Sequence, residues 1–160
     1  MKLNIILISV LLILSSCGYS MRGSISIPSS IESVSVTSNG YSELVNILNS
    51  SLVSSNIQTS ISKSDDIYGI VILSESFDRR QLSINVAGRV NEYELIYNVN
   101  FELRAPSKKS IKDRIILYRD YSFDENNVMG NTDREGDIKK EMMSVVSKLI
   151  FNKLIASAKK

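Results

Sequence analysis

Hydrophobic and polar positions alternate along much of this chain, and the alternation is clearest between Arg89 and Arg104. Six apolar side chains there fall on every second position: Tyr93, Leu95, Tyr97, Val99, Phe101 and Leu103. A strand places such residues on one face, whereas a helix would scatter them around its axis. We therefore predict a half-buried strand, roughly 50 Å long if fully extended, in an antiparallel sheet with one polar face.

The same alternation predicts three further strands. One is short and contains the Val-Ser-Val segment at 34–36, and the others span Ile67–Phe77 and Ile111–Phe123. The apolar residues of Ile67–Phe77 occupy both phases, which indicates a central or partly covered strand. Lys108 and Lys109 fall in the turn before the last strand. Because strands this long carry their turns away from a globular body, we expect a projecting basic tip there.

Apolar residues at helical spacing predict a helix from about Tyr41 to Ser55. Its apolar stripe consists of Tyr41, Leu44, Val45, Leu48 and Leu52, with Ile47 beside it. Ser42 or Asn39 would cap this helix, because both side chains accept hydrogen bonds from free backbone N–H groups at a helix start.

A second amphipathic helix is predicted from about Thr132 to Ser157, after a polar, turn-like segment at 124–131. Thr132 and Glu135 have the S/T-x-x-E form of a capping box at its start. The predicted stripe of this helix is Ile138, Met142, Val145, Leu149 and then either Asn152 or Lys153, with Val146, Ile150 and Leu154 beside it.

The resulting order, β-α-β-β-β-α, predicts an α+β fold in which two helices pack on one face of a four-stranded, largely antiparallel sheet. The chain has 160 residues, which is the size of one domain. The opposite face of the sheet would stay polar. Water is one explanation for that polar face, and a polar partner surface is the other.

The first sixteen residues have the pattern of an export signal. Ile5–Leu14 is almost wholly apolar but too short to span a bilayer. It ends in Leu14-Ser15-Ser16-Cys17, which resembles the lipobox of bacterial lipoproteins. We expect a signal peptide at 1–16, a mature domain at 17–160, and S-diacylglycerol and N-palmitoyl groups on Cys17. The alternative, a buried N-terminal helix, would show a polar face that this run lacks.

Composition excludes several function classes. The 19 basic and 17 acidic residues give a net charge of +2, too balanced for a dedicated nucleic-acid-binding protein. There is no histidine and one cysteine, so an internal disulfide, a Cys/His zinc site and histidine acid–base catalysis are impossible. Phosphate loops and nucleophile elbows are also missing from the sequence. We expect no catalytic activity, no metal and no cofactor.

Basic residues are the remaining candidates for a binding site. The candidates are Arg79, Arg80, Arg89, Arg104, Lys108 and Lys109. Such residues suit phosphate or carboxylate groups on a partner. The alternative is a solvated hairpin end that charge keeps soluble and unpaired.

Three stretches of the chain resemble the LptE family of lipopolysaccharide-assembly lipoproteins. They occur in the family's order and span essentially the whole mature chain. The stretches are Cys17-Gly18-Tyr19-Ser20-Met21-Arg22-Gly23, Asn91-Glu92-Tyr93-Glu94-Leu95 and Arg119-Asp120-Tyr121-Ser122-Phe123-Asp124, the last followed by Asp133, Glu135 and Lys140-Glu141-Met142.

This resemblance implies an outer-membrane lipoprotein that plugs and helps to assemble the LptD β-barrel and takes part in lipopolysaccharide transport. It makes the six basic residues candidates for lipopolysaccharide binding. Gly18 after the cysteine is similar to the signal that directs enterobacterial lipoproteins to the outer membrane. Thr132 stands where some members carry a lysine, so that particular lipid contact is not implied here. The alternative is another small outer-membrane lipoprotein that acts as an envelope adaptor.

Overall fold

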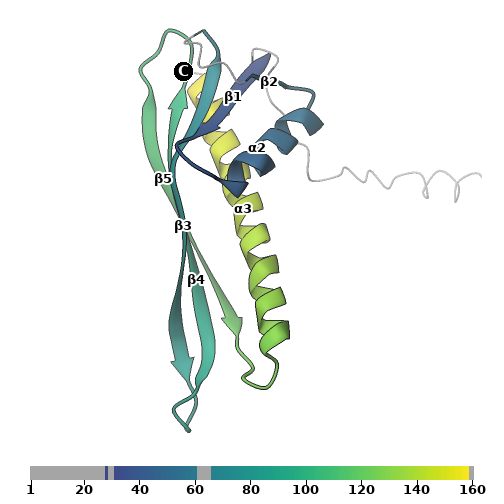
Figure 1. Ribbon diagram of the computed structural model, residues 1–160. Coiled ribbons are helices and arrows are strands. Elements are labelled where there is room, and N and C mark those ends of the chain that lie inside the picture. Colours follow the sequence, from purple (N-terminus) through teal and green to yellow (C-terminus); the bar gives the residue numbers. More distant parts are fainter. Residues whose placement is uncertain (1–27, 29–30, 61–65, 159–160) are drawn as a thin grey trace, which may run out of the picture.

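The computed structural model describes residues 28, 31–60 and 66–158 (Figure 1). The signal peptide at 1–16, Cys17 and the first family-like stretch lie outside the described residues. The elements are β1 Ser33–Ser38, α2 Glu43–Ser54, β2 Gln58–Ser60, β3 Tyr68–Ile84, β4 Val90–Arg104, β5 Ile111–Ser122 and α3 Val128–Ala158.

The sheet has five strands in the order β2-β1-β3-β4-β5 and is mixed. β3, β4 and β5 are antiparallel neighbours, whereas β1 runs parallel to both β2 and β3. The prediction of four largely antiparallel strands was therefore only roughly right. β2 has three residues and no buried side chain, so no alternation marks it in the sequence. β1 and β2 are parallel because α2 forms the crossover between them and returns the chain to the same end of the sheet.

β3 is longer than predicted, and an irregularity explains its mixed apolar pattern. Ile70 and Ile72 face the same side as their β4 partners Leu103 and Phe101. The register then shifts between Ile72 and Ser74, after which Phe77 pairs with the inward Tyr97. A β-bulge of this kind moves the buried phase by one residue. The expectation of a central strand is confirmed by its position in the sheet.

Beyond Phe77, β3 continues to Ile84 and forms a long hairpin with β4 that projects past the helices (Figure 1). The turn at 85–89 is closed by the Asn85 side chain, which accepts hydrogen bonds from the backbone N–H groups of Ala87 and Arg89 at 3.0 Å each. Gly88 has a φ of 75°, which glycine adopts without the steric cost that a Cβ brings.

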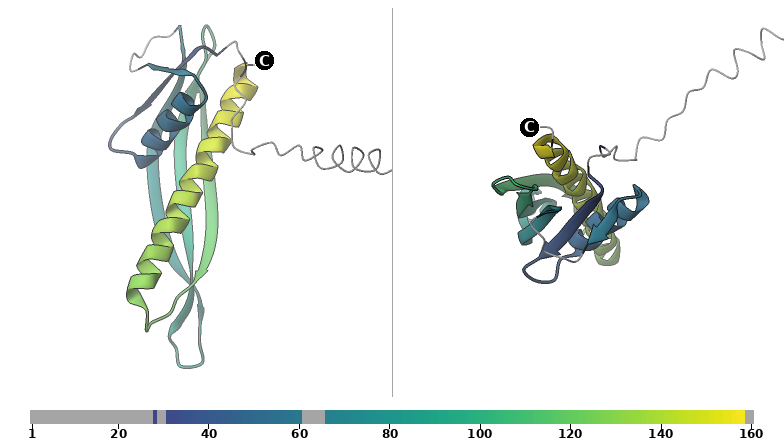
Figure 2. Two further views of the ribbon diagram at one scale, coloured as in Figure 1. Left: turned by 90° about the vertical axis from the view of Figure 1, so that its right-hand side faces the viewer. Right: turned by 90° about the horizontal axis from the view of Figure 1, so that it is seen from above.

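Both helices cover one face of the sheet, as predicted (Figure 2). One cluster of buried side chains lies between the layers, and the inward positions of β4 supply much of it. α2 contributes Leu44, Leu48 and Leu52, which are all 0% exposed. α3 contributes Met142, Met143, Val146, Ile150, Phe151 and Leu154. The predicted α2 stripe is confirmed at its three leucines, but Tyr41 is 93% exposed and precedes the helix. In α3 the buried face is centred on Val146, Ile150 and Leu154, whereas Leu149 of the predicted stripe is 37% exposed.

The predicted cap of α2 is confirmed, whereas the predicted start of α3 was wrong. Ser42 caps α2, because its hydroxyl accepts a hydrogen bond from the N–H of Val45 at 3.3 Å. The capping box at Thr132 was wrong, since α3 already begins at Val128. The Thr132 hydroxyl instead donates to the Val128 carbonyl at 3.1 Å inside the helix. The side chain of Asn127 accepts from the N–H of Gly130 at 3.0 Å and serves as the cap.

Among the described residues, no helix has both the length and the apolar character needed to cross a bilayer.

Candidate functional site

The six basic candidates lie in three separate parts of the fold. Arg79 and Arg80 lie within β3, not after it, and point to opposite faces of the sheet. Arg89 lies at the projecting β3–β4 turn. Arg104, Lys108 and Lys109 lie at the β4–β5 turn, at the other end of β4. The structure therefore brings together only the last three.

The β4–β5 turn carries three cationic residues, Arg104, Lys108 and Lys109, here together called the basic turn. A cavity of about 650 Å³ opens there, lined by Glu102, Arg104, Ala105, Ser107, Lys108 and Ser110. Arg104 Nε donates to Glu102 Oε1 at 2.8 Å, and this hydrogen bond lowers the pKa of Glu102 despite the opposing effect of burial. The hollow therefore presents cations beside one ionised carboxylate.

The basic turn does not project, which corrects the expectation of a basic tip. Lys108 Nζ donates to the carbonyl of Ser157 at 3.2 Å, so the turn lies against the C-terminal end of α3. Lysines suit this position, because the last carbonyls of a helix carry partial negative charge. Lys109 is exposed. The projecting tip is the other hairpin, which carries Arg89 alone among the candidates.

Arg89 joins the projecting hairpin to the segment before α3 through an ion pair with Glu125. This contact links the β3–β4 turn to the segment between β5 and α3, and Figure 1 shows both segments at the lower end of the molecule. Both side chains are exposed, so the pair positions the hairpin more than it stabilises the fold.

Arg80 belongs to the outer face of the sheet, which is the face without helices. Arg80 Nε donates to Glu94 Oε2 at 2.5 Å. Arg114 donates to Asn98 at 2.8 Å, and Asn100 donates to Ser74 at 2.8 Å. The outer face is thus largely polar and internally hydrogen-bonded, which confirms the polar face expected from the alternation in β4.

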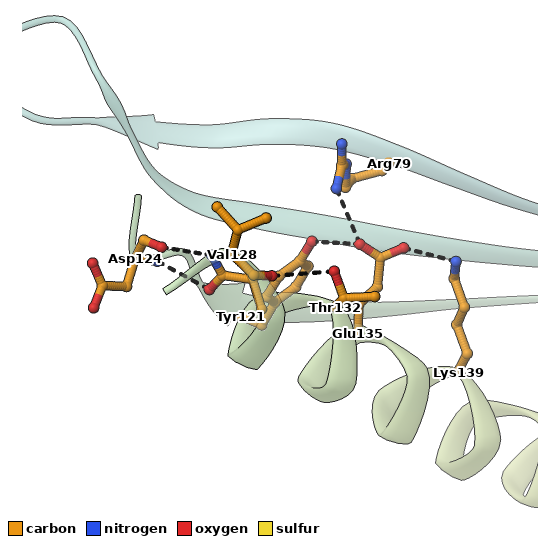
Figure 3. Close-up of polar contacts among 8 residues, drawn as sticks. Arg79, Tyr121, Asp124, Val128, Thr132, Glu135 and Lys139 are labelled. Carbon is orange, nitrogen blue, oxygen red and sulfur yellow. Dashed lines mark hydrogen bonds and ion pairs between the residues drawn. The ribbon is translucent and has the colours of Figure 1, made fainter. Parts of the chain in front are cut away.

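Arg79 lies on the inner face and enters a charged network at the start of α3 (Figure 3). Its guanidinium donates to Glu135 Oε2 at 3.0 Å, and the Tyr121 hydroxyl donates to the same oxygen at 2.8 Å. Lys139 Nζ lies 2.7 Å from Glu135 Oε1. We call Arg79, Tyr121, Glu135 and Lys139 the Glu135 network. The network sets two cations against one carboxylate, and the Arg79 side chain stays 48% exposed.

The Glu135 network holds Glu135 ionised. Burial alone would raise the pKa of this carboxyl, but hydrogen bonds from Lys139 and Tyr121 and the charges of Lys139 and Arg79 outweigh it and lower the pKa. The Arg79 guanidinium also lies 4.5 Å from the ring centroid of Tyr93, a cation–π geometry. The network itself connects β3, β5 and α3, and the contact of Arg79 with Tyr93 adds β4.

The segment before α3 is fixed beside the Glu135 network. The Asn131 side chain accepts from the N–H of Asp124 at 3.1 Å and donates to the Asp124 carbonyl at 2.6 Å (Figure 3). A cavity of about 430 Å³ lies against this region, with Asn131, Glu135 and Lys139 in its wall. Sequence reasoning missed the roles of Tyr121 and Asn131, because both depend on contacts between distant segments.

The side chains of the basic turn, the outer face and the Glu135 network suit the binding of anions and polar surfaces. Within the part of the chain that the structure describes, no three Cys, Asp or Glu side chains gather where they could hold a metal ion. Exposed cationic residues lie at the basic turn, on β3, on β5 and on α3.

Three solved structures with a similar fold are described as lipoproteins. The rare lipoprotein B of Shewanella oneidensis is 26% identical, with a TM-score of 0.72 over 79% of this chain and 96% of that one. An uncharacterized lipoprotein B of Nitrosomonas europaea is 22% identical, with a TM-score of 0.72 over 89% and 93%. A minor lipoprotein of Acinetobacter baumannii shares the fold at 18% identity and a TM-score of 0.62, over 79% and 92%.

No curated protein matches the chain significantly in sequence. Residues 31–154, however, match the family described as LptE: Lipopolysaccharide-assembly. This match covers every described strand and nearly all of α3. The chain therefore belongs to the LptE family of lipopolysaccharide-assembly lipoproteins.

Proposed function

We propose that this protein is an outer-membrane lipoprotein that plugs and helps to assemble an LptD-type β-barrel during lipopolysaccharide transport to the outer leaflet. The observation that carries the proposal is the LptE match over residues 31–154. Because that family is non-enzymatic, the protein would act by binding and by shaping its partner, without turnover of a substrate.

The outer face of the sheet supports a plug role. Arg80, Glu94, Asn98 and Arg114 form its hydrogen-bonded polar surface. The lumen of an outer-membrane barrel is itself polar and wet, in contrast to its lipid-facing wall. A domain that buries its main apolar cluster between the helices and the sheet, and has a largely polar outer sheet face, fits such a lumen.

Cys17 would hold the protein at the membrane through diacylglycerol on its sulfur and palmitate on its amino group. Stable anchoring needs two or more acyl chains, since each buried methylene contributes only about 0.8 kcal/mol. Only a short stretch of sequence separates Cys17 from Pro28, where the described fold begins. The lipid would therefore keep the domain close to the membrane surface.

The basic turn is the best-placed candidate for contact with lipopolysaccharide, whose phosphate groups are anionic. Arg104 and Lys108 line the hollow there, and Lys109 is exposed next to Lys108 in the chain. Among the described residues, neither lysine forms an ion pair with a carboxylate, whereas the four arginine candidates do. The alternative is that the basic turn serves only the fold, because Lys108 also binds a carbonyl at the end of α3.

The second candidate function is an envelope adaptor that has no LptD-type partner. The two candidates differ in what the protein binds, so co-purification separates them. From membranes solubilised in mild detergent, the tagged full chain is expected to co-purify with an LptD-type barrel, and its depletion should reduce mature barrel and surface lipopolysaccharide. Normal levels of both after depletion would leave the adaptor function standing.

The same cells provide a control for the anchor. Growth with labelled palmitate should label the mature protein, and Cys17→Ser should abolish the label and release the protein from the membrane fraction. Retention of the label in that variant would place the lipid elsewhere.

Charge reversal at the basic turn tests the lipopolysaccharide contact. The K108E/K109E variant is expected to bind purified lipopolysaccharide about tenfold more weakly at low salt, because two charge-assisted contacts to phosphate are lost. High salt should shrink the difference, since ions screen exposed charges. Arg104 is left in place because it holds Glu102.

The matched control is K140E/K148E, which changes the net charge equally on the exposed face of α3. Equal weakening by both variants would mean that overall charge, and not the basic turn, governs binding. Unchanged binding in K108E/K109E would assign the basic turn to the fold alone.

A further inference from the structure

β5 lies at one edge of the sheet, and the edge of this strand that faces away from β4 pairs with no other strand among the described residues. It is 12 residues long, and about half of its backbone N–H and C=O groups point away from β4. Three large apolar side chains on it are exposed: Ile111 at 51%, Ile116 at 37% and Tyr118 at 51%. An open edge of this length is a template for pairing with another strand.

Charged residues usually discourage such pairing, but those of β5 are arranged in a self-complementary order. When the strand is set antiparallel to a second copy of itself about Ile116, Lys112 faces Asp120 of the other copy. In the same register Asp113 faces Arg119. Each pair occurs twice by symmetry, so the charges that would repel an arbitrary strand attract this one.

The remaining positions in this register also match. Arg114 faces Tyr118, a combination suited to a cation–π contact, and Ile115 faces Leu117. Ile116 faces its own copy at the two-fold axis. The pairing with β4 places the even-numbered residues on the outer face and the odd-numbered residues on the inner face. Every facing combination therefore lies on one face, as a sheet requires.

Other registers lose this match. A shift by two residues in one direction leaves Arg114 with Asp120 as the remaining opposite-charge combination, and a shift in the other direction leaves none. A shift by one residue would set Asp113 against Asp120 or Lys112 against Arg119. The register centred on Ile116 is thus selected by charge as well as by apolar contact.

We propose that two copies of this chain associate through antiparallel pairing of β5, with the two-fold axis at Ile116, and join their sheets into one. The contact is isologous, so it closes after two copies and does not propagate. It requires nothing from a barrel partner, and neither the proposed plug role nor the basic turn depends on it.

Charge swaps at Lys112 and Asp120 test the pairing in the full chain, purified in detergent and measured by sedimentation equilibrium. Both residues are exposed, whereas Asp113 also binds Lys153 at 2.6 Å. Each single variant, K112D or D120K, creates two like-charge pairs and is expected to raise the dimer dissociation constant about tenfold. The double variant K112D/D120K restores both attractions and should return within about twofold of the unaltered chain.

Circular dichroism of the four proteins shows whether each is folded, and the restoration in the double variant cannot come from a general loss of stability. A monomeric unaltered chain at every concentration would overturn the proposal. So would a double variant that dissociates as readily as the two single variants.

Oxidative cross-linking provides a second measurement in envelopes. Ile116→Cys places two thiols at the two-fold axis and is expected to form a disulfide-linked dimer on a non-reducing gel. Ile84→Cys is the matched control, because Ile84 is 63% exposed and lies in the β3–β4 hairpin. Equal cross-linking in both variants contradicts the pairing. Cross-linking of Ile116→Cys to a different protein would assign the β5 edge to that partner and overturn the proposal.

Discussion

Replacing Phe101 with alanine is expected to lower the free energy of unfolding by about 4 kcal/mol, because the ring fills the centre of the core. Phe101 is 0% exposed, points from β4 toward the helices and lies opposite Ile72 on β3. Its removal forfeits the burial of the ring and leaves a cavity that strands on both sides prevent from collapsing. Urea unfolding followed by circular dichroism measures the loss, which corresponds to about 10 °C in Tm.

Tyr41→Ala is the matched control for the aromatic ring. Tyr41 is 93% exposed and precedes α2, so its removal should change the free energy of unfolding by no more than about 0.5 kcal/mol. A similar loss in both variants would contradict the position of the core between the helices and β4.

Glu135→Ala is expected to cost about 2 kcal/mol, the second-largest effect, because it removes the shared acceptor of the Glu135 network. The side chain of Glu135 is 18% exposed, and Tyr121 is only 3% exposed. The Tyr121 hydroxyl and the Arg79 guanidinium would each lose a hydrogen-bond acceptor in a partly buried site. Unfolding at neutral pH measures the loss, and hydrogen exchange should show it concentrated at the start of α3.

Glu141→Ala serves as the control on the same helix, because Glu141 is exposed, and it should be neutral within about 0.5 kcal/mol. The pH dependence is a further check. Since the pKa of Glu135 is lowered in the folded protein, its ionised form stabilises the fold above the ordinary value of 4.5, and this contribution is lost as pH falls through the folded-state pKa. The stability difference between the unaltered chain and E135Q should therefore shrink in acid. A difference that grows in acid would contradict the lowered pKa.

Local patterns in the sequence determined the parts of the fold that depend on one segment at a time. The alternation of β4 identified a strand and its buried residues, and the spacing of Leu44, Leu48 and Leu52 identified α2. Ser42 was recognisable as a cap because capping involves a side chain and a backbone group three positions away. Family-like stretches indicated the LptE family, which the match over residues 31–154 shows.

Tertiary structure alone decided the features that need a distant partner. β2 and the end of β3 are polar and become strands only because β1 and β4 offer them backbone hydrogen bonds. The bulge after Ile72 shifted the buried phase of β3 and obscured its pattern.

The candidate site likewise combines residues that the sequence identified with contacts that only the fold showed. The sequence identified the basic residues, but only the fold separated Arg79, Arg80 and Arg89 from the basic turn and set that turn against α3. It also placed Glu135 between Arg79 and Tyr121, 56 and 14 positions away. Side-chain type and spacing are local properties, whereas charge pairing across elements depends on how the sheet and helices pack, so the sequence determined the residues and the packing decided their partners.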